Sequence, residues 1–104
     1  MTPALNVTLY LYEKKDGGIK SCMNPDGDPW GCATFVRKAD LDLHGPSYGW
    51  RCYISIGGTT FMEPGETRDA TLSFLSEEGL EAALSAGRVY LYGGRFFGEA
   101  TVKL

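Results

Sequence analysis

The residues best able to do chemistry in this chain are three cysteines and a single histidine. Thiolates and imidazole are ligands that zinc prefers, so Cys22, Cys32, Cys52 and His44 could in principle surround one ion. Zinc sites in small domains usually contain two cysteines separated by about two to four residues, and no such pair occurs here. Cys52 also falls in phase with the apolar residues of 50–56, which indicates a core position. The sequence therefore predicts no metal site and no cofactor.

A second set of residues has the oxygen spacing that opens an EF-hand calcium loop. Asn24, Asp26 and Asp28 alternate with other residues, so their side chains could wrap around one cation. The pattern then fails, because Pro29 stands where the loop needs glycine and Phe35 stands where it needs a bidentate glutamate. A turn rich in proline, aspartate and glycine accounts for these residues, and we expect no calcium site.

Catalysis requires groups that the sequence does not bring together. A cysteine activated by His44 would need a residue that orients the imidazole and a donor that stabilises an oxyanion, and neither is recognisable. The acidic pairs Asp40 with Asp42 and Glu77 with Glu78 are typical of solvated surfaces. A phosphate-binding loop of the form G-x-x-x-x-G-K-[ST] is also missing. We therefore expect a protein that is not an enzyme and binds no nucleotide.

Size and composition predict one folded domain over residues 1–104. With 43% hydrophobic and 22% charged residues, the chain has an ordinary globular composition and enough length for one core. Thirteen acidic and ten basic residues are interleaved, so the sequence shows no basic stripe of the kind that binds nucleic acid. Folding could still gather several cations on one side, namely Lys14, Lys15, Lys20, Arg37 and Lys38.

The sequence also carries a prediction about location. The chain begins without a basic region followed by an apolar core, and no later run is long and apolar enough to span a membrane. An odd number of irregularly spaced cysteines favours reduced thiols over a disulfide framework. We therefore expect a cytoplasmic protein that contacts no membrane.

Alternation of apolar and polar residues predicts most of the strands. They are expected at 6–13, 30–38, 50–56 and 69–75, with loops over 14–29 and 40–49. One helix is expected at 76–86, capped by Ser76 and ended by Gly87, with Leu80, Ala83 and Leu84 on its packed face. Trp30 and Trp50 are expected to anchor the core.

The last predicted element is a hairpin at 88–104. Gly93 and Gly94 separate two strand-forming runs, and a two-residue turn needs the positive φ that glycine adopts without steric cost. The total of about six strands and one short helix predicts an all-β barrel or sandwich.

The order of motifs in the last third of the chain resembles the C-terminal β-barrel domain, domain 3, of elongation factor Tu. The matching residues are Met62-Glu63-Pro64-Gly65-Glu66, a strand to Phe74-Leu75, Gly87, and the segment Arg88-Val89-Tyr90-Leu91-Tyr92-Gly93-Gly94-Arg95-Phe96-Phe97-Gly98 with Val102. The likeness covers about forty residues and is loose before them, where the segment 30–35 lacks the arginine and proline of the family. The resemblance implies an all-β fold, a six-stranded antiparallel closed β-barrel with one short helix.

The resemblance also implies a place for contacts. In the family this domain touches the T-stem of tRNA, the exchange factor and its own GTPase domain, and the Gly-Gly hairpin lies close to the RNA backbone. The corresponding residues here are Gly93, Gly94 and Arg95. A shared fold can serve unrelated functions, so this contact is an analogy with the family.

Tyrosines form the other candidate site. By the phase of their strands, five rings are expected on the outer surface, namely Tyr10, Tyr12, Tyr53, Tyr90 and Tyr92. Exposed aromatic rings are typical of contact sites, and cross-strand tyrosine pairs that only stabilise the sheet are the alternative.

Taken together, these patterns predict a non-catalytic binding module with an unidentified protein partner. Its candidate contact residues are Tyr90, Tyr92, Gly93, Gly94 and Arg95. Two alternatives remain open. One is an RNA- or translation-associated binder that uses the hairpin, and the other is a bacterial immunity or inhibitor protein that engages its partner through the barrel.

Overall fold

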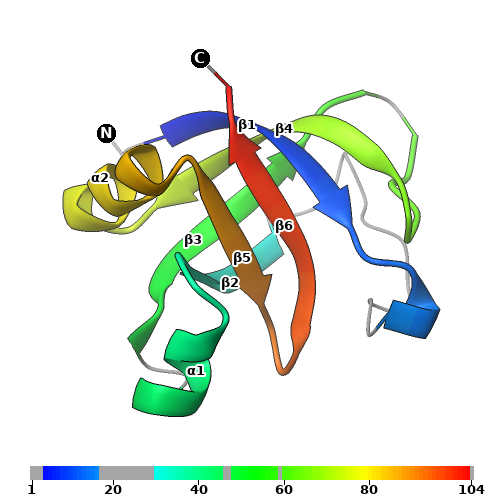
Figure 1. Cartoon of the computed structure of the whole chain (residues 1–104). Coiled ribbons are helices and arrows are strands. Elements are labelled where there is room, and N and C mark those ends of the chain that lie inside the picture. Colours follow the sequence, from blue (N-terminus) through cyan, green and yellow to red (C-terminus); the bar gives the residue numbers. More distant parts are fainter. Residues whose placement is uncertain (1–3, 17–29, 46–47, 59, 104) are drawn as a thin grey trace.

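Six strands close into an antiparallel barrel in the computed structural model, which describes residues 4–16, 30–45, 48–58 and 60–103 (Figure 1). The strands are β1 (Ala4–Leu11), β2 (Trp30–Phe35), β3 (Trp50–Ile56), β4 (Thr67–Phe74), β5 (Arg88–Tyr92) and β6 (Phe96–Val102). The helices are η1 (Lys14–Asp16), α1 (Ala39–His44) and α2 (Glu77–Ala86). The predicted fold class, a six-stranded antiparallel closed barrel with a short helix, is confirmed.

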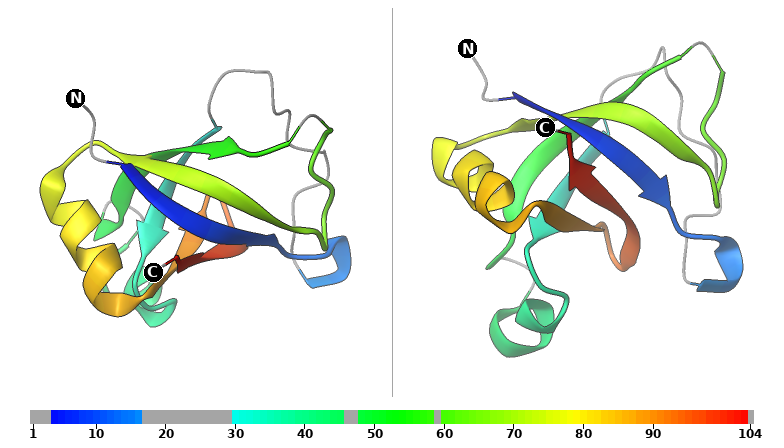
Figure 2. Two further views of the ribbon diagram at one scale, coloured as in Figure 1. Left: turned by 90° about the horizontal axis from the view of Figure 1, so that it is seen from above. Right: turned by 45° about the horizontal axis from the view of Figure 1, so that its top comes forward.

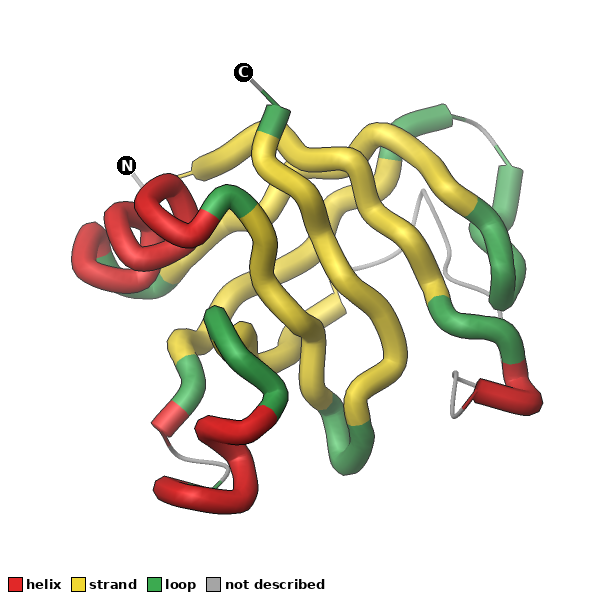
Figure 3. The backbone as a smooth tube through the Cα atoms, in the orientation of Figure 1, coloured by secondary structure: helices red, strands yellow, loops and turns green. Residues whose placement is uncertain are grey.

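The strands follow the order β1-β4-β3-β2-β5-β6 around the barrel, and β6 pairs again with β1. Every neighbouring pair is antiparallel. Closure matters because an open sheet would present unpaired backbone groups along its edge strands. Figure 2 shows the same wall of strands from two further sides, and Figure 3 shows the helices outside that wall.

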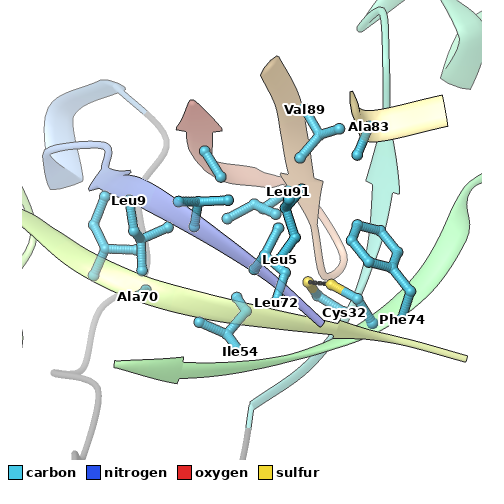
Figure 4. Close-up of a cluster of buried hydrophobic side chains, with 14 of the residues drawn as sticks. Leu5, Leu9, Cys32, Ile54, Ala70, Leu72, Phe74, Ala83, Val89 and Leu91 are labelled. Atoms are coloured by element: carbon cyan, nitrogen blue, oxygen red, sulfur yellow. Dashed lines mark hydrogen bonds between the residues drawn. The ribbon is translucent and has the colours of Figure 1, made fainter. Parts of the chain in front are cut away.

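The core fills the inside of the barrel with residues that alternate along each strand. On β1, Val7, Leu9 and Leu11 are fully buried, as their spacing predicts. Other strands contribute the buried side chains of Cys32, Cys52, Ile54, Ala70, Leu72, Phe74, Val89, Leu91, Phe97 and Ala100. Figure 4 shows many of these side chains converging on one interior. Trp30 and Trp50 are only partly buried and pack against this core from its rim.

Helix α2 begins and ends where the sequence predicts. The Ser76 hydroxyl accepts a hydrogen bond from the Gly79 backbone N–H at 3.2 Å, and the Gly87 N–H donates to Ala83 O at 2.9 Å. Gly87 has a φ of 76°, the left-handed conformation that glycine favours at a helix end. Ala83 is buried on the packed face, but Leu84 is 49% exposed, so its predicted packing is wrong.

The predicted loop at 40–49 contains the six-residue helix α1. Residues 39–44 alternate apolar and polar side chains, so they lack the helical periodicity that would have revealed it. The helix is held locally, because the Asp40 carboxylate accepts a hydrogen bond from Arg37 at 2.9 Å. Asp40 is buried, so its expected place on a solvated surface is wrong. The strand predicted at 30–38 also ends earlier, at Phe35, where the chain turns toward this helix.

The closing hairpin differs from the predicted two-residue turn. Tyr92 pairs with Phe96, so Gly93, Gly94 and Arg95 form a three-residue connection. Only Gly94 has a positive φ, at 82°, whereas the predicted turn built on two glycines would favour positive φ at both. The Gly93 N–H donates to Arg95 O at 2.9 Å and closes the connection.

A bulge lies beside this hairpin. Leu91 pairs with Gly98 and Tyr92 pairs with Phe96, which leaves Phe97 as an extra residue in β6. Phe97 and Gly98 are both buried, so the bulge interrupts the alternation of β6. Phe96 then lies on the opposite side of the strand from Phe97, among the tyrosines of the outer surface.

Candidate functional site

The structure places the five predicted contact residues along β5 and the tip of the closing hairpin. Tyr90 and Tyr92 are half-buried and alternate with Val89 and Leu91, which are buried in the core. Their rings therefore lie on the outer surface, as predicted. Gly93, Gly94 and Arg95 are exposed at the tip of the hairpin, which projects beyond the barrel wall in Figure 1.

Strand register brings tyrosines from β1 and β5 to opposite sides of one carboxylate. Glu99 on β6 pairs with Tyr10 on β1 and with Tyr90 on β5. Residues directly opposite in an antiparallel sheet have their Cβ atoms about 5 Å apart, so the three side chains form one row across three strands. Glu99 is half-buried in this row.

Ring contacts extend this row into a cluster on the outer surface. Tyr10 and Tyr12 meet edge to face with ring centres 5.7 Å apart, and Tyr92 meets Phe96 in the same way at 5.3 Å. The buried Phe35 ring supports Tyr92 at 5.9 Å and Phe96 at 5.7 Å. We name the outer rings of this cluster the aromatic face: Tyr10, Tyr12, Tyr90, Tyr92 and Phe96.

A lysine ammonium lies over the aromatic face. Lys38 Nζ is 4.5 Å from the centre of the Tyr12 ring, 5.3 Å from Tyr90 and 5.7 Å from Phe96. Each distance falls within the range of a cation–π interaction. Lys38 reaches the rings from the short segment between β2 and α1. The contact therefore links this segment to rings at β1, β5 and β6.

The Tyr12 hydroxyl connects the rings to the carboxylate. It donates to Glu99 Oε2 at 3.3 Å. Partial burial is the main cause that raises the pKa of Tyr12 above its ordinary 10.0, and the negative charge of Glu99 adds to it. Lys38 opposes this shift, because its positive charge favours the ionised phenol. Tyr12 is thus neutral at physiological pH and keeps its hydroxyl proton for Glu99.

One of the five predicted outer tyrosines lies elsewhere. Tyr53 is 42% exposed on β3, and β3 is separated from β1 by β4 and from β5 by β2. Sequence reasoning predicted the outer rings of β1 and β5 but missed Phe96, Glu99 and Lys38 as parts of the same cluster. The bulge interrupts the alternation of β6, so the sequence pattern does not predict on which side of the strand Phe96 lies. The register that places Glu99 opposite both tyrosines has no local sequence signal.

Two of the three cysteines face each other inside the barrel. Cys32 pairs directly with Cys52 across β2 and β3, and their Sγ atoms are 3.6 Å apart, as the dashed line in Figure 4 marks. The hydrogen bond to Cys52, together with burial, raises the pKa of the Cys32 thiol far above its ordinary value. Neither thiol is a ready nucleophile or metal ligand in this setting.

The other chemical candidates stay apart. The His44 ring is exposed at the end of α1 and stacks on Tyr48 with ring centres 4.2 Å apart. Within the part of the chain that the structure describes, no three histidine, cysteine, aspartate or glutamate side chains are grouped to hold a metal ion. The remaining residues weighed for zinc and calcium lie outside the described ranges, namely Cys22, Asn24, Asp26, Asp28 and Pro29.

The site is therefore a mixed surface of aromatic rings, one cation and one carboxylate on the outside of a closed barrel. No protein-family model matches the chain, and no curated protein is significantly similar to it in sequence. The resemblance to the barrel of elongation factor Tu thus rests on the residues quoted for it. None of the described helices has the length and apolar character needed to cross a bilayer.

Proposed function

We propose that this chain is a non-catalytic protein-binding module and that the aromatic face is its contact surface. The observation that carries the proposal is the gathering of Tyr10, Tyr12, Tyr90 and Tyr92 on one outer surface, at β1 and β5 on the two sides of β6. The core inside the barrel is already filled by aliphatic and aromatic residues, so these outer rings are not needed to complete it.

The chemistry of the aromatic face suits a protein partner. Tyrosine offers a large apolar ring with few rotatable bonds and a hydroxyl that can bond at the rim, which is why tyrosine is enriched in protein interfaces. The rings here are half-buried and braced by one another, so their ordering cost on binding is small. A closed barrel adds a rigid support beneath them.

Charge around the surface favours protein over RNA. Lys15 pairs with Glu13 at 3.3 Å, and Arg37 pairs with the buried Asp40 at 2.9 Å. Lys38 lies over the rings, where its charge meets aromatic faces. These cations are engaged within the chain, and Glu99 adds a negative charge in the middle of the surface, which would repel a phosphate backbone.

The proposed kinship with the elongation factor Tu barrel is a separate part of this proposal. It is supported by the six-stranded antiparallel architecture and by the order of the Pro-Gly, Gly-Gly-Arg and later glycine motifs. A reducing compartment such as the cytoplasm is proposed as well, because the buried thiols of Cys32 and Cys52 are free.

Affinity capture from the native host with a matched pair of variants tests the function. Tyr90→Ser with Tyr92→Ser removes two rings of the aromatic face, and Tyr53→Ser removes one exposed ring from the distant β3. We expect the double variant to lose a co-purifying protein that the wild type and Tyr53→Ser both retain. An unchanged set of bound proteins would contradict the proposal, and recovery of RNA that depends on the hairpin residue Arg95 would favour the RNA-binding alternative.

A further inference from the structure

We propose that Tyr12, Tyr90, Phe96 and Glu99 form a cation cage that Lys38 occupies in the free protein, and that a lysine side chain of the partner takes its place in the complex. This inference rests on the proposed function, since it names the group of the partner that the aromatic face would recognise. In the free protein, Lys38 thus occupies the position that the lysine of the partner would take in the complex.

The cage has the composition of an ammonium-binding site. Three rings lie within 5.7 Å of one ammonium nitrogen, each measured to the ring centre. The faces of such rings carry the negative part of the aromatic quadrupole and attract a cation. Glu99 adds a full negative charge at the Tyr12 hydroxyl, 3.3 Å away. Aromatic faces with a nearby carboxylate complement a positively charged, alkyl-bearing group better than a neutral or anionic one.

The rings are positioned by the barrel and not by Lys38. The Tyr12 backbone N–H donates to Phe97 O at 3.0 Å, which ties its backbone to β6. Tyr90 is fixed by pairing with Phe35 on one side and Glu99 on the other. Phe96 packs edge to face on Phe35. The cage is therefore expected to keep its shape after Lys38 leaves, because none of these supports involves that residue.

Lys38 is held weakly enough to be displaced. It makes no ion pair with any residue in the described ranges, and the contacts of its ammonium are those with the three rings. The residue is exposed and directly precedes α1, a helix of only six residues. Lysine has a flexible four-carbon stem, so the ammonium can leave the rings by rotation of the side chain without movement of α1.

Room for the rest of a ligand lies next to the cage. A shallow depression of about 390 Å³ borders Tyr90, and its lining residues come from β5, β6 and the ends of β2 and α2: Val36, Ala86, Gly87, Arg88, Tyr90 and Thr101. A partner lysine that entered the cage beside Tyr90 could place its flanking chain in this depression. The depression is thus suited to the segment that presents the lysine.

Occupation by Lys38 makes a quantitative prediction. The apparent affinity of a site falls in proportion to the fraction of molecules in which it is open, so removing the internal occupant should strengthen binding of an added cation. A cation–π contact of ordinary strength corresponds to a gain of about threefold to tenfold. The variant Lys38→Ala empties the cage, and Lys38→Met keeps most of the apolar stem while removing the charge.

The six tyrosines of the chain provide the readout. With ¹³C-labelled tyrosine, the ring signals are followed while tetramethylammonium is added at constant ionic strength, and tert-butanol serves as the neutral probe of similar shape. We expect the signals of Tyr12 and Tyr90 to shift in Lys38→Ala with an affinity about threefold to tenfold above that of the wild type. Tert-butanol should not reproduce the shifts, and adding Tyr90→Ser to Lys38→Ala should abolish the gain.

The outcomes separate this inference from the proposed function. Equal tetramethylammonium affinity in the wild type, Lys38→Ala and Lys38→Met would overturn the cage, as would equal shifts with tert-butanol. If the cage binds cations but Tyr90→Ser with Tyr92→Ser leaves the captured proteins unchanged, the protein-binding function fails and the cage stands. If no variant binds the cation although the double variant loses its partner, the function stands and the cage fails.

Discussion

A Cβ atom at Gly98 would lie 2.6 Å from the Tyr10 carbonyl oxygen, closer than a Cβ carbon approaches a backbone oxygen. Glycine at this position therefore allows β6 to lie against β1 where the bulge brings two consecutive residues inward. The same approach sets Glu99, the next residue, beside Tyr10. The absence of a side chain at Gly98 thus permits the strand pairing that places Glu99 beside the rings of the aromatic face.

Gly98→Ala should destabilise the fold. The added methyl group must push β6 away from β1, and overpacking of this kind costs about 1–3 kcal/mol of unfolding free energy. Urea unfolding measures the loss. Gly93→Ala is the matched control in the same hairpin, because its Cβ would meet only the Phe97 side chain at 3.4 Å and its φ is not positive. Equal stability of the two variants would contradict the close approach.

Arg68 should be the main polar support of the connection between β3 and β4. Its guanidinium donates to the backbone oxygens of Gly57 at 3.0 Å, Thr60 at 2.6 Å and Phe61 at 3.3 Å, and it pairs with Glu66. Arg68→Ala removes these charge-assisted hydrogen bonds, which together contribute about 1–3 kcal/mol of unfolding free energy. Thermal unfolding compares this variant with Arg95→Ala, a control at the exposed tip of the hairpin. A loss no larger than that of the control would refute the role of Arg68.

Stability should depend on the ionisation of Glu66. The Glu63 backbone N–H donates to its carboxylate at 3.1 Å, and Arg68 adds a positive charge, so the pKa of Glu66 lies below its ordinary 4.5. Because the folded state holds the ionised form, this contribution is full above the unfolded pKa and is lost as the pH falls through the folded pKa. The difference in unfolding free energy between wild type and Glu66→Gln should therefore shrink below about pH 4.5. Glu81→Gln on α2 is the control, and a difference that stays constant with pH would count against the ion pair.

The thiols of Cys32 and Cys52 should be inert in the folded protein. Both are 1% exposed, and the raised pKa of Cys32 keeps it protonated at pH 8. In a Cys22→Ser background, a thiol reagent should label neither cysteine until denaturant is added, after which both react. Rapid labelling of the native variant would show that the barrel opens readily between β2 and β3.

The alternation of residues was enough to predict most of the barrel. The inside of a closed barrel excludes water and its outside is solvated. Alternate residues of β1 therefore face the core, namely Val7, Leu9 and Leu11, while Tyr10 faces outward. The bounds of β1 and β4 begin two residues before their predicted starts, which reflects pairing between them rather than local sequence. Helix α1 was not predicted because it is short and its sequence lacks helical periodicity.

The candidate site could be predicted only in part. Tyr90 and Tyr92 follow from the phase of one strand, so they were accessible to sequence reasoning. The contact between Lys38 and Tyr12 depends on barrel closure, on the bulge at Phe97 and on the chain direction after β2, and none of these has a local signal. Contacts between segments far apart in the chain need the three-dimensional register.

The most direct test of the account is to locate the partner on the surface of the barrel. All six tyrosines lie within the described residues: Tyr10, Tyr12, Tyr90 and Tyr92 on the aromatic face, Tyr53 on the distant β3, and Tyr48 stacked on His44. With ¹³C-labelled tyrosine, the ring signals are compared before and after addition of the captured partner. We predict that the four signals of the aromatic face shift or broaden while those of Tyr48 and Tyr53 do not. Changes confined to Tyr48 or Tyr53 would contradict the account.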